Sequence, residues 1–184
     1  MDRKIVTKFL GNLLKADKLR APGKYWASEV TIDWATPNTK RVDFMLFSPE
    51  DQCSVSGLEK GIFTCYEIKS CKADVYSGKG LNFLGEKNYI VTTMECYKSL
   101  LPDLREGTFR KHLIECFPES SFYYGFIVAV PTFRDEKLEF DNPTPIPADG
   151  RTDGWKLKII APCRPGLRTR SMTELLFCML RSGH

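Results

Sequence analysis

Histidine is scarce in this chain of 184 residues, which holds only His112 and His184. The seven cysteines include no Cys-x-x-Cys pair, so the ligand spacing of a structural zinc site is absent. An odd number of cysteines without such pairs favours reduced thiols in a cytosolic protein. Several of them stand inside apolar runs, where cysteine behaves as a small apolar residue.

Long apolar runs are missing as well. No stretch approaches the roughly 20 apolar residues that a membrane-spanning helix needs. The chain begins Met1-Asp2-Arg3-Lys4 and lacks the apolar segment of a signal peptide. We therefore expect a cytoplasmic protein without a membrane partner.

The composition is that of an ordinary folded chain. Apolar residues make up 42% and charged residues 27%, which argues against a disordered chain. We predict one domain over 1–184, with its core at about 1–131, a loop or insertion at 134–153 and a C-terminal strand and helix at 154–184.

The net charge of +4 is unevenly distributed along the chain. Residues 1–24 and residues 151–184 each carry seven Lys or Arg and two acids, a net charge of +5 apiece. The segment between them has 13 basic and 19 acidic residues. Basic ends around an acidic centre suit a protein that binds a polyanion next to an acidic metal site, although the lysines could equally be the solvated sides of terminal helices.

The pattern of apolar residues predicts an α/β fold with a central mixed sheet flanked by helices. We predict helices over 3–19, from about 93 to before Pro102, over 108–117, and after the capping box Ser171-x-x-Glu174. We predict strands over 25–33, 40–47, 61–69, 88–92, 122–130 and 155–159. Short links between the first three strands indicate an antiparallel meander.

The second and third predicted strands carry charges among apolar residues. Asp43 stands between Val42 and Phe44, and the third strand contains Glu67 and Lys69. Strand side chains alternate between faces, so Glu67 and Lys69 share one face, and Asp43 can lie beside Glu67 if the strands pair. The simpler alternative is a partly exposed cross-strand ion pair, worth under about 1 kcal/mol.

Two neighbouring carboxylates repel each other unless a cation lies between them. A hard divalent ion such as Mg²⁺ or Mn²⁺ suits oxygen ligands. Mg²⁺ usually keeps several water ligands and also binds a phosphate of the substrate. Such an ion lowers the pKa of a bound water, while a lysine can offset charge on a phosphate. The trio Asp43, Glu67 and Lys69 therefore predicts metal-assisted hydrolysis of a phosphodiester.

The stretches Arg41-Val42-Asp43-Phe44 and Tyr66-Glu67-Ile68-Lys69-Ser70 together resemble the PD-(D/E)xK nuclease superfamily. The similarity is to its small bacterial and phage members, including MmcB-like DNA repair proteins, and continues through Asp74, Gly80–Gly85 and Asn88–Val91. Val42 replaces the proline of the family pattern. The resemblance implies a restriction-endonuclease-like sheet and a deoxyribonuclease of DNA repair, phage or mobile-element DNA processing.

The resemblance also implies roles for individual residues. Asp43, Glu67 and Lys69 would be catalytic, with Asp43, Glu67 and the backbone carbonyl of Ile68 as metal ligands. Family members often add a glutamate from the first helix, but residues 1–28 contain none. Glu29 is therefore the candidate for the extra acidic ligand, and the alternative is that it is an exposed strand residue. Contacts to the nucleic-acid backbone are expected from the following residues, each of which could instead be a solvated loop residue or ion-pair partner: Arg41, Ser70, Lys72, Lys79 and Asn82.

Two functions follow as hypotheses. The first is a metal-dependent nuclease whose partner is DNA, with RNA as the other nucleic acid considered. The second is an inactive nuclease-fold module that binds nucleic acid or a protein. The apolar C-terminal helix adds a homodimer as a further hypothesis.

Overall fold

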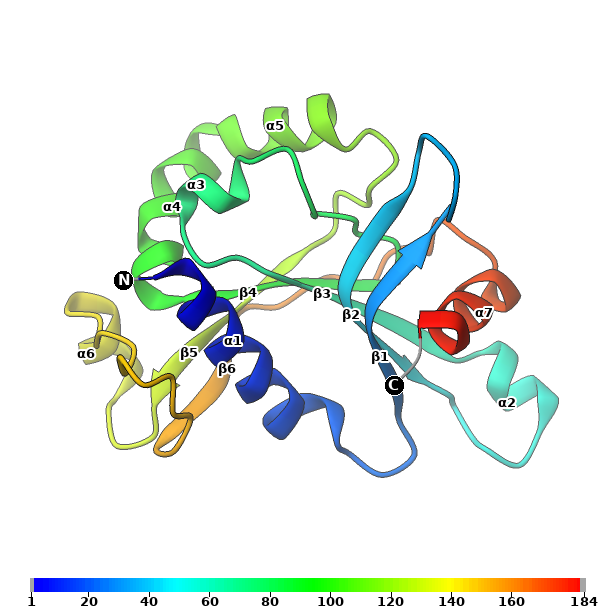
Figure 1. Ribbon diagram of the computed structural model, residues 1–184, viewed down its shortest axis with the longest axis horizontal. Helices are drawn as coiled ribbons and strands as arrows, with labels where there is room; N and C mark the ends of the chain where they lie inside the picture. Colours follow the sequence, from blue (N-terminus) through cyan, green and yellow to red (C-terminus); the bar gives the residue numbers. More distant parts are fainter. Residues whose placement is uncertain (1, 183–184) are drawn as a thin grey trace.

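A six-stranded sheet runs through the molecule, with helices on both of its faces (Figure 1). The computed structural model describes residues 2–182. The strands are β1 (Tyr25–Ile32), β2 (Lys40–Ser48), β3 (Ile62–Ile68), β4 (Lys87–Thr93), β5 (Gly125–Pro131) and β6 (Trp155–Ala161). They lie in sequence order across the sheet.

The sheet is mixed, as the sequence predicted. β1, β2 and β3 pair antiparallel and form the expected meander. β4 and β5 then add in parallel, and β6 returns antiparallel to β5. Every residue of β5 is buried, which fits a central strand covered on both faces.

Helices and one π-helical segment, η1, surround this sheet. They are α1 (Arg3–Leu14), η1 (Lys15–Leu19), α2 (Val55–Glu59), α3 (Lys72–Val75), α4 (Met94–Glu106), α5 (Thr108–Cys116), α6 (Glu136–Asp141) and α7 (Met172–Ser182). Within the described residues, none of these helices has the length and apolar character needed to cross a membrane.

α1 covers one face of the sheet, and the apolar stripe predicted for it is confirmed. Phe9, Leu10 and Leu14 are inaccessible to solvent and pack in one cluster with Phe44 and Ile68 of the sheet. Burying each such side chain contributes about 1.5–3 kcal/mol. This packing fixes the position of α1, whose first turn lies near α3, where Arg3 pairs with Asp74 (Figure 1).

The opposite face is covered in two parts. α7 packs Leu175 and Met179 against β1 to β3, while α3, α4 and α5 cover β4 and β5. The last turn of α7 also bonds to the outer strand β1. The backbone N–H of Thr31 donates to the Ser182 hydroxyl at 3.1 Å, and the Arg181 guanidinium donates to the Thr31 carbonyl.

The prediction that a helix ends before Pro102 is wrong. α4 continues to Glu106 and ends at Gly107, whose φ of +80° suits glycine. Proline inside a helix costs about 3 kcal/mol. Leu100 is fully buried and Leu104 packs against the same apolar cluster, so tertiary packing offsets that cost.

The polar stretches also hold more structure than expected. The predicted loop at 134–153 contains α6, where the buried carboxylate of Glu139 accepts hydrogen bonds from the backbone and hydroxyl of Thr144. The prediction of a strand from residue 122 is wrong at its start, since β5 begins at Gly125. The short helices α2 and α3 lie between predicted strands, where no helix was predicted.

Candidate active site

The site lies where β2 and β3 separate. Their pairing ends at Phe44 and Tyr66, so Asp43 and Glu67 are the next residues on each strand. Beyond this point β2 pairs only with β1, and β3 only with β4. The backbone N–H of Ile68 donates to the Asp43 carboxylate at 2.8 Å, which ties the two strands together across the opening.

Glu67 is the most deeply buried charged residue of this site. Its side chain is inaccessible to solvent. Oε1 accepts a hydrogen bond from the Asn82 backbone N–H at 3.1 Å, but Oε2 is buried with no hydrogen-bond partner. An unsatisfied buried acceptor of this kind is unusual in folded proteins and calls for an explanation.

Both carboxyl groups have raised pKa values. Burial raises the pKa of Glu67 well above its ordinary 4.5, and the nearby charge of Asp43 raises it further, against the attraction of Lys69. Burial also raises the pKa of Asp43, while the Ile68 N–H and the charge of Lys69 act in the opposite direction. Without a further positive charge, the ionised forms of both groups are disfavoured.

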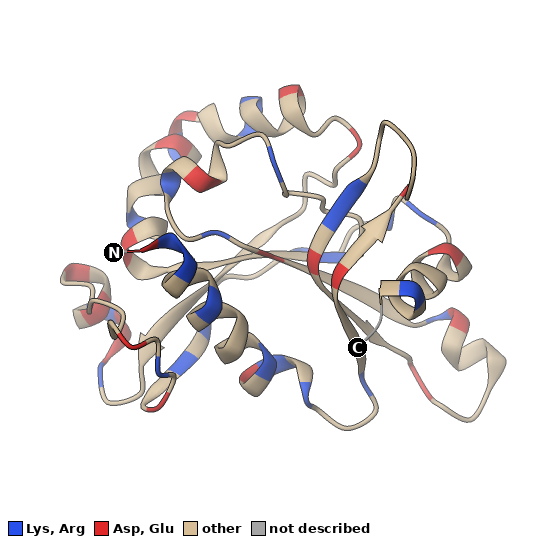
Figure 2. Ribbon diagram, viewed as in Figure 1, with Lys and Arg blue, Asp and Glu red and all other residues tan. Residues whose placement is uncertain are grey.

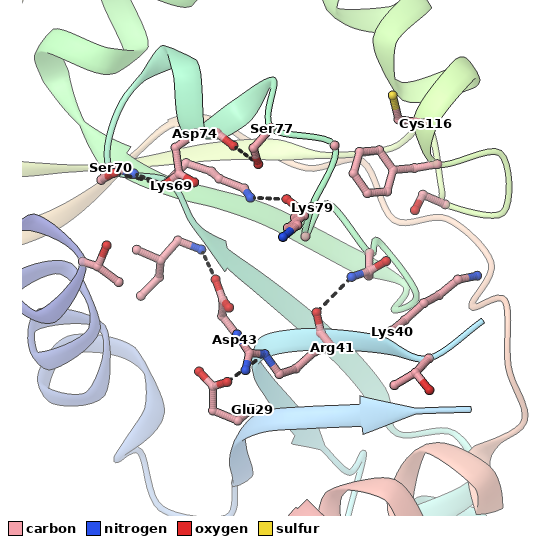
Figure 3. Close-up of a pocket in the computed structure, with 18 of the residues that line it drawn as sticks. Glu29, Lys40, Arg41, Asp43, Lys69, Ser70, Asp74, Ser77, Lys79 and Cys116 are labelled. Atoms are coloured by element: carbon pink, nitrogen blue, oxygen red, sulfur yellow. Dashed lines mark hydrogen bonds and ion pairs between the residues drawn. The ribbon is translucent and has the colours of Figure 1, made fainter. Parts of the chain in front are cut away.

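Lys69 follows the last residue of β3 and is held at both ends. Its backbone N–H donates to the Val91 carbonyl at 3.0 Å, and its carbonyl accepts from the Thr92 hydroxyl at 2.5 Å. The ammonium donates to the Lys79 carbonyl at 2.7 Å (Figure 3). These contacts leave Lys69 only 4% exposed, so its ammonium has a defined position.

Gly80 lies next to Glu67 and Lys69 in this part of the site. Its φ is +54°, and a side-chain carbon built there would lie 3.1 Å from Oε2 of Glu67 and 3.3 Å from Nζ of Lys69. The free carboxylate oxygen and the ammonium therefore border the same small space, which a glycine leaves open.

A cleft of about 1200 Å³ opens over Asp43 and Lys69 (Figure 3). Its walls come from the start of α1, the turn between β1 and β2, the segment 77–82 and the segment after α5. Seven Lys or Arg and four Asp or Glu line it, so the cleft carries an excess of positive charge. Figure 2 shows lysines and arginines on the parts of α1 and β2 that border it.

The structure brings several further predicted residues to this cleft. Arg41 and Glu29 both line it, but they form an ion pair with each other at 2.8 Å. Ser70 also lines the cleft, where its N–H and hydroxyl both donate to Asp74 at 3.0 Å. Lys79 lines it as well.

Two of the predicted nucleic-acid contacts have other partners. Asn82 lines the cleft but is only 6% exposed; its backbone N–H donates to Glu67, and its side-chain amide donates to the Arg41 carbonyl at 2.9 Å. Lys72 does not line the cleft; its ammonium pairs with Asp103 of α4 at 2.8 Å.

Sequence reasoning singled out the basic residues 1–24 as a whole but named no residue of α1 as a contact. Arg3, Lys4 and Lys8 line the cleft, and Arg3 also pairs with Asp74 at 3.3 Å. The available signal was the placement of three cations in the first two turns of a predicted helix with no acid after its cap.

The described residues contain no group of three or more His, Cys, Asp or Glu side chains arranged to hold a metal ion. Glu29 is thus not gathered with Asp43 and Glu67 into a three-carboxylate cluster, and its role as a ligand remains a prediction. Two carboxylates nevertheless fit Mg²⁺, which takes few protein ligands and keeps waters. The free Oε2 of Glu67 is the observation that supports this fit.

Comparisons with known proteins add no relative. A scan against models of protein families found no match, and searches of curated proteins and of solved structures found none.

Proposed function

We propose that this protein is a divalent-metal-dependent nuclease that hydrolyses phosphodiester bonds of DNA. The observation that carries the proposal is the buried carboxylate of Glu67, which has an unpartnered oxygen beside Asp43 and Lys69. A buried charge without a partner is costly, and a cation shared with Asp43 would offset that cost. The basic cleft above the site supports a polyanionic substrate.

Each residue has a role in this proposal. Asp43 and Glu67 would hold Mg²⁺ or Mn²⁺ with the Ile68 carbonyl. The bound ion would supply a Lewis acid that polarises a phosphodiester and lowers the pKa of water. Lys69, fixed by the Lys79 carbonyl, would place a positive charge beside the phosphate as negative charge develops on it.

Cleavage of supercoiled plasmid in Mg²⁺ or Mn²⁺ tests this function. Asp43→Asn and Lys69→Met should each lower the cleavage rate by at least about a hundred-fold, the lower range for loss of one electrostatic group. Lys111→Met is the matched control, because Lys111 is exposed and does not line the cleft. Cleavage that survives both site substitutions would overturn the proposal.

The alternative function is a nuclease-fold module that binds nucleic acid or a protein without cutting. The lack of a three-residue metal cluster among the described side chains favours it. It predicts that wild-type protein binds nucleic acid but shows no heat of Mg²⁺ or Mn²⁺ binding by calorimetry. Metal binding that is lost in Asp43→Asn would contradict it.

A further inference from the structure

The first two turns of α1 form an exposed basic wall of the cleft. Arg3, Lys4 and Lys8 all line the cleft and are exposed. Arg3 pairs with Asp74, whereas Lys4 and Lys8 form no ion pair with any described residue. Two ammonium groups on this wall therefore make no direct ion pair within the described residues.

Helix stability does not explain these cations. The N-terminus of a helix carries a partial positive charge, so cations are unfavourable there. The one acid at this end of α1 is the N-cap Asp2, whose carboxylate accepts a hydrogen bond from the Lys4 backbone N–H at 3.0 Å, and the first turn itself contains no acid to balance three cations. Lys4 and Lys8 are also spaced i, i+4, which places like charges next to each other on the helix surface. An anionic ligand would relieve both unfavourable terms.

The rest of the cleft indicates which kind of anion fits. Among the described residues that line it, Phe117 is the only aromatic one, and it is 9% exposed. The cleft thus lacks the stacking platforms that bind unpaired bases. Lysine contacts to phosphates carry no base information, which suits binding along a phosphodiester backbone.

We infer that the basic wall of α1 binds the phosphodiester backbone of a nucleic acid, with Lys4 and Lys8 each contacting a phosphate. The backbone held there passes over the floor of the cleft, where Asp43 and Lys69 lie. The inference rests on the proposed function for its class of partner, but it concerns binding and needs no cleavage.

Binding to fluorescein-labelled oligonucleotides in EDTA tests the wall. We compare wild type with Lys4→Gln/Lys8→Gln, using a DNA duplex, a DNA single strand and an RNA duplex of the same sequence. The double variant should bind about ten-fold or more weakly at moderate salt, and its slope of log K against log salt should be shallower by about 2. Weakening on both duplexes supports recognition of the shared backbone, and weakening on DNA alone supports DNA as the partner.

The matched control is Arg20→Gln/Lys24→Gln, which removes the same charge from exposed residues outside the cleft. The inference predicts that this control keeps the wild-type salt slope. An equal loss in both double variants, or wild-type binding by Lys4→Gln/Lys8→Gln, would overturn the inference. Failure of wild type to bind any of the three oligonucleotides would also overturn it.

Thermal unfolding checks that the variant is folded. Lys4→Gln/Lys8→Gln should melt no lower than wild type, because the removed charges are unfavourable for α1. Since binding is measured without metal, the two proposals fail separately. If wild type shows no cleavage but the variant loses binding, the nuclease proposal fails and the inference about the basic wall stands.

Discussion

Replacing Glu67 by glutamine should make the metal-free protein more stable at neutral pH. Glutamine has nearly the same shape and keeps an oxygen for the Asn82 N–H. It removes a carboxylate that is fully buried and has one unpartnered oxygen. The amide nitrogen of glutamine takes the place of the unpartnered oxygen, so the gain comes from removing a buried negative charge that lies near Asp43. We expect a gain in the free energy of unfolding on the order of 1 kcal/mol or more, since a pKa shift of one unit corresponds to about 1.4 kcal/mol.

The gain should depend on pH in a defined direction. Burial raises the pKa of Glu67 in the folded state above the 4.5 of the unfolded chain. Between those two values the folded protein holds a proton that the unfolded chain has lost, so wild-type stability falls as pH rises through this window. Glutamine does not titrate. Its advantage should be complete above the folded pKa and should disappear below pH 4.5.

Mg²⁺ should reverse the order of stability. A ligand that binds only the folded state at a hundred times its Kd stabilises that state by about 2.7 kcal/mol. Wild type should gain this stability, whereas Glu67→Gln, which lacks one of the two carboxylates, should not.

Urea denaturation followed by tryptophan fluorescence measures both effects, in EDTA and in Mg²⁺, across a series of pH values. Glu50→Gln is the matched control, because Glu50 is an exposed acid in a surface ion pair with Lys60. A Glu67→Gln protein less stable than wild type at pH 7 without metal would refute the reasoning. So would a Mg²⁺ response equal to that of wild type.

Two remaining predictions concern backbone strain near the site. Glu29 has φ of +55°, a left-handed conformation that costs a non-glycine residue about 1–2 kcal/mol, so Glu29→Gly should be about 1 kcal/mol more stable to urea than Glu29→Ala. Equal stability of those two variants would show that Glu29 is unstrained. Gly80→Ala should lower both stability and cleavage rate by crowding Glu67 and Lys69. Gly78→Ala is the control, because Gly78 has a φ of +70° and an added carbon there meets no atom within 4 Å. This variant therefore shows only the backbone cost of about 1–2 kcal/mol. Equal cleavage rates in Gly78→Ala and Gly80→Ala would contradict the crowding of Glu67 and Lys69.

The location of Asp43 and Glu67 on neighbouring strands could be predicted from sequence because it depends on local rules. Alternation along a strand and short links between strands were sufficient to place the two carboxylates on neighbouring strands, and the structure confirms that placement. The apolar stripe of α1 was equally predictable, since its apolar residues recur with the period of a helix.

The remaining details depend on contacts between distant segments. Asn82 looked like a loop residue free to contact nucleic acid, but its N–H binds Glu67, 15 positions earlier in the chain. α4 continues through Pro102 because Leu100 is buried against other helices, and local propensity carries no record of that packing. The seven cations of the cleft come from segments spread over residues 3–79, so no local window reveals them together.

The hydrogen bonds between α7 and Thr31 bear on how copies of this protein meet. An outer strand with free backbone groups is a template on which another chain can add a strand and begin aggregation. Ser182 and Arg181 occupy the N–H and the carbonyl of Thr31, so a second chain can pair at this residue only after the end of α7 has moved away. The last turn of α7 therefore blocks strand addition at Thr31 on the sheet edge. This role is distinct from the core packing of Leu175.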